Sequence, residues 1–144
     1  MEHLDTVKLL RECDAGVKMA VASIDDVLEY VTDDQMKQLL QESKSHHEEL
    51  KRELYDILST HGMHEKEPNP MAKGMSWMKT NMKMTMDCSD QTIADLIIDG
   101  CDMGIKSLHK YKNQYENANH TAQEMCDKLI AIEEKLRKDL NPYL

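Results

Sequence analysis

The sequence predicts an all-α protein, an antiparallel four-helix bundle built from two related hairpins. Strand-forming residues are sparse, and the 144 residues include only 5 Gly and 3 Pro, so little interrupts a helix. Apolar residues recur at alternating intervals of three and four, as on a helix face turned toward a bundle core. In addition, the phrase Cys-Asp-x-Gly occurs at 13–16 and again at 101–104. This repeat indicates that the two halves of the chain are built alike.

The first predicted hairpin contains helices over residues 4–31 and 34–61. Thr32-Asp33-Asp34 supplies a turn and an N-cap, and Gly62 ends the second helix. The predicted inward face of the first helix is Val7, Leu10, Asp14, Val17, Val21, Ile24, Leu28 and Val31. That of the second is Met36, Leu40, Ser43, His47, Leu50, Leu54, Ile57 and His61. A short turn between two helices of equal length predicts an antiparallel pair.

The second predicted hairpin contains helices over residues 91–117 and 121–140. Ser89 or Asp90 caps the first of these helices, and Asn141-Pro142 ends the second. The predicted inward face of the last helix is Cys126, Leu129, Glu133, Leu136 and Leu140. When the leucines of the second and fourth long helices are aligned, His47 is placed opposite Glu133.

The connection between the hairpins, residues 62–88, is far longer than a bundle turn requires. Pro68 and Pro70 break any helix, and residues 71–86 are predicted to form a short extra helix. Its methionine stripe is Met71, Met75, Met78 and Met82. A connection of this length can cross the bundle, so that the second and third long helices lie parallel. We therefore expect residues 1–144 to form one domain.

Composition excludes several classes of partner. A net charge of -9 argues against binding to nucleic acid or to an anionic membrane surface. No apolar run approaches the length of a spanning helix and no signal peptide opens the chain, so we expect a cytoplasmic protein. The four cysteines form no C-x-x-C pair and are expected to be buried, reduced thiols.

Short motifs in this chain resemble those of the ferritin-like superfamily. The matching residues are Asp14 with Gly16, His47, and Gly74 with Trp77. More closely, the chain is similar to small bacterial ferritin-like domains of uncharacterised function, distantly related to rubrerythrin. The resemblance covers nearly the whole chain and implies a bundle with one long crossover. Metal-binding members of the superfamily carry Glu-x-x-His motifs, which this sequence lacks, so the motifs do not support a di-iron oxidase or ferroxidase, and no catalytic residue is predicted.

Polar residues on the predicted inward faces form a candidate metal site: Asp14, His47, Asp102 and Glu133. Three carboxylates and an imidazole at one level would bind Fe, Mn or Zn. The repeat places Asp102 on an inward face with Ile98, Ile105 and His109. Glu42, His46 and His109 are further candidate ligands.

The alternative for these polar residues is an internal network. Charges inside a bundle must be paired or exposed, because each costs several kcal/mol otherwise. Asp14 or Asp102 would then bond to His47, Lys18 or Lys106 and fix the helix register. Gly16 and Gly104 each cost about 1 kcal/mol inside a helix. They predict a close approach of the first and third long helices or, as an alternative, room for a ligand beside the aspartate.

Two functions follow from these patterns, and a third is a more distant alternative. The first is binding of a transition metal at a degenerate inter-helix site of carboxylates and histidine. The second is a metal-free interaction bundle that contacts a protein partner, or a second copy in a homodimer, through Met71–Met86. The third is histidine phosphotransfer, because residues 46–51 are similar to the phosphorylated motif of such domains.

Overall fold

The computed structural model describes residues 1–63, 78 and 87–144. Its long helices are α1 (Glu2–Leu28), α2 (Asp34–Thr60), α5 (Asp90–Gln114) and α6 (His120–Leu140), followed by the short 3-10 helix η1 (Asn141–Tyr143). The described ranges contain helices and turns but no strand, which confirms the all-α prediction. Within those ranges no helix combines the length and the apolar character needed to cross a membrane.

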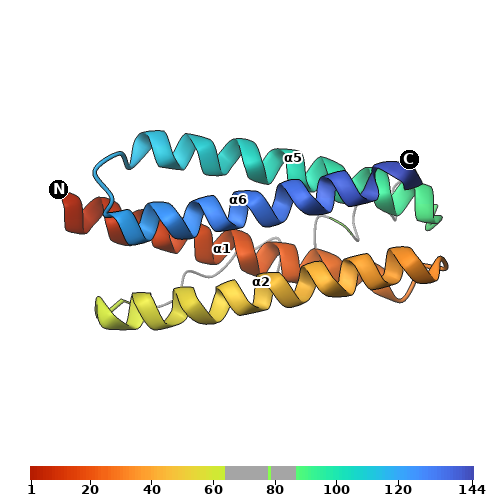
Figure 1. Ribbon diagram of the computed structural model, residues 1–144, viewed down its shortest axis with the longest axis horizontal. Coiled ribbons are helices and arrows are strands. Elements are labelled where there is room, and N and C mark those ends of the chain that lie inside the picture. Colours follow the sequence, from red (N-terminus) through yellow and green to blue (C-terminus); the bar gives the residue numbers. More distant parts are fainter. Residues whose placement is uncertain (64–77, 79–86) are drawn as a thin grey trace.

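The helices are arranged as two antiparallel hairpins, α1 with α2 and α5 with α6 (Figure 1). α2 ends at one end of the bundle and α5 begins at the other, so these two helices run in the same direction, as expected from the long connection (Figure 1). α1 packs against the other three helices, and α6 also packs against α2. α2 and α5 therefore lie at opposite corners of the bundle, on either side of the α1–α6 pair.

Helix ends follow the capping residues that the sequence supplies. The side chains of Asp33, Ser89 and Asn119 accept hydrogen bonds from the backbone amides at the starts of α2, α5 and α6. Gly62 adopts φ +68, the left-handed conformation that terminates α2 without steric cost. α1 ends at Leu28, three residues before its predicted end, and α5 ends at Gln114 rather than at 117.

One carboxylate ties the α1–α2 turn to the second hairpin. Asp90 accepts hydrogen bonds from the Thr32 amide at 2.9 Å, the Thr32 hydroxyl at 2.8 Å and the Asp33 amide at 2.9 Å. These donors hold the pKa of Asp90 below its ordinary value, with the Thr32 amide as the largest cause. The early end of α1 leaves Thr32 and Asp33 extended enough to reach Asp90.

The core consists of two apolar clusters, one toward each end of the bundle. Between them, α2 and α6 contribute the buried polar residues Ser43, His47 and Glu133. Met78 is helical and 1 % exposed, and it belongs to the cluster around Ile24. The rest of the predicted helix over 71–86 lies outside the described residues, and so does the partner contact predicted for it. Gly74 and Trp77, which carry part of the family resemblance, also lie outside them.

Candidate functional site

The centre of the bundle holds a hydrogen-bonded pair of polar side chains. His47 of α2 is fully buried, and Glu133 of α6 is 7 % exposed. The His47 Nε2 and Glu133 Oε1 atoms are 2.8 Å apart. Because these two positions correspond in the alignment of the hairpins, the contact joins equivalent points of the two halves. The alignment of the hairpins made His47 and Glu133 equivalent positions, and the structure adds that their side chains are in contact.

The second nitrogen of His47 determines how the pair shares its protons. His47 Nδ1 lies 2.7 Å from the backbone carbonyl oxygen of Ser43. A carbonyl oxygen can only accept a hydrogen bond, so Nδ1 carries a proton. One further proton must then lie between Nε2 and Glu133 Oε1, because two bare acceptors at this distance would repel. The pair thus holds the imidazole ring in one orientation and satisfies both buried groups.

Cys101 of α5 adds a third helix to this polar centre. Its thiol is 2 % exposed and donates a hydrogen bond to Glu133. Burial, together with the charge and the hydrogen bond of the Glu133 carboxylate, raises the pKa of the Cys101 thiol far above its ordinary value. Cys101 is therefore a neutral donor at this site, and its thiolate chemistry is suppressed.

Asp102 does not face the core, and that part of the prediction is wrong. Its side chain is 49 % exposed and forms an ion pair with Arg137 of α6. Successive residues of a helix are separated by about 100° around the axis. The inward direction of α5 passes through Cys101, so its neighbour Asp102 emerges at the surface. His109, expected on the same face as Asp102, is also exposed.

Asp14 is buried as predicted but, among the described residues, does not join His47 and Glu133 in a group that could hold a metal ion. Asp14 instead pairs with Lys18 at 3.0 Å, as the network alternative expected.

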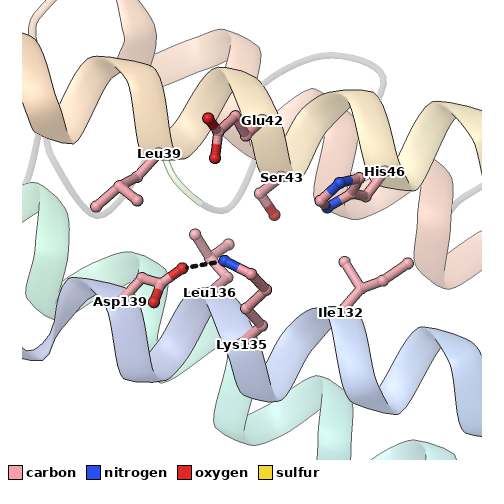
Figure 2. A pocket seen from close by; sticks show the side chains of 8 residues that line it. All are labelled: Leu39, Glu42, Ser43, His46, Ile132, Lys135, Leu136 and Asp139. Atoms are coloured by element: carbon pink, nitrogen blue, oxygen red, sulfur yellow. Dashed lines mark hydrogen bonds and ion pairs between the residues drawn. The ribbon is translucent and has the colours of Figure 1, made fainter.

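The other candidate ligands lie on the outer side of α2. Glu42 and His46 are exposed and line a cavity of about 10 Å³ between α2 and α6. Figure 2 shows Ser43 between them and the Lys135–Asp139 ion pair across the cavity. A cavity of this size holds one water molecule at most. Glu42 and His46 lie at the surface, whereas His47 and Glu133 are buried, so they do not share one site.

The four predicted ligands thus do not converge on one point. Across residues 1–63, 78 and 87–144, no three His, Cys, Asp or Glu side chains are grouped so that they could hold a metal ion. The structure brings together His47 and Glu133 and adds Cys101, which sequence analysis missed. Metal binding at His47 and Glu133 remains a prediction.

The remaining cysteines are free thiols, and two of the three are buried. The Cys13 thiol is fully buried and donates a hydrogen bond to Cys126, which raises the pKa of Cys13 together with burial. The Cys126 thiol lies 3.7 Å from the carbonyl oxygen of Leu108. Cys13, Cys101 and Cys126 are thus buried free thiols as expected, whereas Cys88 is exposed.

The paired glycines do not produce a close approach of α1 and α5, so that prediction is wrong. A Cβ atom on Gly16 would meet Leu129 of α6 at 3.5 Å, and one on Gly104 would lie 4.0 Å from Glu133 Oε2. Both glycines instead line a pocket of about 610 Å³ between α1 and α5. Pockets of this size accommodate small organic ligands.

Small and apolar residues form most of this pocket, which we call the α1–α5 pocket. Its small residues are Ala15, Gly16, Ala20, Ser23, Gly100, Gly104 and Ser107. Apolar side chains from α1, α5 and α6, together with Met78, complete the walls. Cys101 and Glu133 line it as well, so the polar centre of the bundle opens into the pocket.

Comparisons with known protein families, with curated proteins and with solved structures find no match to this chain.

Proposed function

We propose that this protein is a non-enzymatic binding protein of ferritin-like fold that takes up a small organic molecule in the α1–α5 pocket. The observation that carries the proposal is the pocket itself: about 610 Å³ of space to which α1 and α5 contribute seven small residues. Glycine, alanine and serine forgo the apolar burial that larger side chains would provide there. A bound apolar molecule would restore that burial.

The ferritin-like assignment is supported by the chain path. Two antiparallel hairpins are joined by one long connection, and α2 runs parallel to α5 (Figure 1). A four-helix bundle with one long crossover has this connectivity. The polar centre of His47, Glu133 and Cys101 lies in the middle of the bundle, where it gives the pocket one polar wall.

The test is to fill the pocket from its wall. Gly100 is suited to this, because a Cβ atom there has no described neighbour within 4 Å. Gly100→Leu should weaken binding of the uncharged fluorescent probe N-phenyl-1-naphthylamine at least tenfold, and it should retain helicity because a helical glycine is removed. Gln41→Leu, at an exposed position of α2, adds the same side chain outside the pocket and is the matched control. Equal probe binding by the two variants would reject the proposal.

A transition metal is the second candidate, favoured by the buried imidazole and carboxylate that α2 and α6 bring together. His47 Nε2 and Glu133 Oε1 are 2.8 Å apart. Imidazole with carboxylate suits Fe, Mn or Zn. Elemental analysis of protein purified without a metal-affinity tag tests this candidate. Near-stoichiometric Fe, Mn or Zn in the parent, absent from His47→Ala, would support it, and a metal-free parent would reject it.

A further inference from the structure

We infer that the ligand of the α1–α5 pocket is an amine with an apolar body, bound through its ammonium group to Glu133. This inference rests on the proposed function and adds the chemical class of the ligand. It depends on three features: the position of the Glu133 carboxylate, the charges along the walls, and the apolar character of the pocket and its mouth.

The Glu133 carboxylate has acceptor capacity directed at the pocket. Its Oε1 atom contacts His47, while Oε2 lies only 4.0 Å from where a Cβ atom on Gly104 would stand. Gly104 lines the pocket, so the absence of a side chain there leaves Oε2 uncovered. A carboxylate offers about four acceptor positions, and His47 and Cys101 account for two of them. A donor group on a ligand can occupy a third.

The charges around the pocket favour a cation and disfavour an anion. Among the described residues that line it, the ionisable acids are Glu12 and Glu133, and none is Lys, Arg or His. Three described basic side chains of the helices around the pocket are paired with acids: His47 with Glu133 Oε1, Lys18 with Asp14 and Arg137 with Asp102. The net charge of -9 adds a long-range attraction for cations. An ammonium group can donate to Glu133 Oε2, which is an acceptor whether the shared proton lies on His47 or on Oε1, whereas a ligand carboxylate there would bring two acceptor groups together.

The rest of the pocket fits an apolar body. Leu96, Ile97 and Leu108 of α5 line it together with residues of α1 and α6. Two exposed methionines line it as well, Met19 of α1 at 44 % exposure and Met103 of α5 at 57 %. Methionine adapts its shape to different apolar partners. An aliphatic or aromatic body could therefore pass between these side chains and leave the amine at Glu133.

Three probes with the same ten-carbon tail separate charge from hydrogen bonding: decylamine, decyltrimethylammonium and decanoate. Calorimetric titration below the micellar concentration should show decylamine binding at least tenfold more tightly than decanoate. Decyltrimethylammonium, a cation without an N–H donor, should bind about tenfold more weakly than decylamine. Glu133→Gln should weaken decylamine binding about tenfold and leave decanoate binding unchanged or stronger. Glu134→Gln makes the same charge change at the next, exposed residue and should alter neither.

The outcomes distinguish the ligand class from the binding function. If decanoate binds as tightly as decylamine, or if Glu133→Gln and Glu134→Gln behave alike, the amine assignment is wrong while the pocket remains a binding site. If no probe binds the parent protein, or if Gly100→Leu binds decylamine as the parent does, the proposed function itself fails. Circular dichroism of each variant establishes that a loss of binding is not a loss of fold.

Discussion

Replacing either member of the His47–Glu133 pair should destabilise the protein far more than replacing both. His47→Leu leaves the Glu133 carboxyl group facing a leucine in a site only 7 % exposed. Glu133→Leu leaves the buried Nε2 atom of His47 without its 2.8 Å partner. The double variant removes both polar groups and joins the two apolar clusters into one core.

The magnitudes follow from the burial of the two groups. Breaking a buried pair by removing one partner costs about 3–5 kcal/mol. His47→Leu should cost an amount at the lower end of this range, because the Glu133 carboxyl group that it leaves unpaired also lines the α1–α5 pocket. Leaving a neutral imidazole nitrogen unsatisfied costs about 1–3 kcal/mol. Replacement of a whole buried pair by leucines is often neutral or stabilising, so the double variant should lie within about 1 kcal/mol of the parent. The coupling energy is then about 4 kcal/mol or more.

Urea denaturation followed by circular dichroism measures all four proteins. For a domain of 144 residues, a loss of 3 kcal/mol corresponds to a fall in Tm of about 10 °C. The matched control is the exposed Lys128–Glu53 pair, which joins the same two helices at 3.4 Å. Its cycle should give a coupling below about 1 kcal/mol. A double variant whose loss equals the sum of the single losses would refute the reasoning.

Three further perturbations test how the helices are fixed. Asp90→Asn should cost about 1 kcal/mol at neutral pH by weakening the bonds from Thr32. Folding lowers the Asp90 pKa from 3.8, so the stability difference between the parent and Asp90→Asn should vanish as the pH falls through that lowered pKa. A difference in urea midpoints that stays constant with pH would contradict this prediction. Asn119→Ala should cost about 1 kcal/mol by removing the cap on the Ala122 amide, and an unchanged Tm would count against that role. Leu54→Ala should cost about 3 kcal/mol by opening a core cavity, and a loss below 1 kcal/mol in urea would show that the site collapses.

Local patterns were sufficient for the helices and for half of the polar centre. The predicted inward face of α6 is buried throughout, including Glu133, and on α2 His47 is buried as well. Heptad spacing works for these helices because each presents one stripe to its neighbours. α1 packs against three helices, so Leu9, Cys13 and Val27 are buried outside its predicted stripe.

On α5 the sequence pattern predicted the wrong one of two adjacent residues to face the core. Cys101 and Asp102 are neighbours in a repeated phrase, and the repeat suggested that Asp102 occupies the position of Asp14. A rotation of about 100° decides which of two adjacent side chains is buried. The apolar character of Cys101 and the reach of Arg137 to Asp102 settle that rotation in the folded protein. The signal available in the sequence was that cysteine is among the most buried residue types.

By itself, the sequence determined the four helices, the caps of α2 and α5, the pairing into two hairpins and the correspondence of His47 with Glu133, because periodicity and capping act over a few residues. Only the tertiary structure decided that Asp14 and Asp102 are separated from that pair and that Cys101 joins it. It alone also revealed the α1–α5 pocket. Helix rotation and axial register depend on how all four helices pack together, and a void is a property of the space between helices rather than of any one of them.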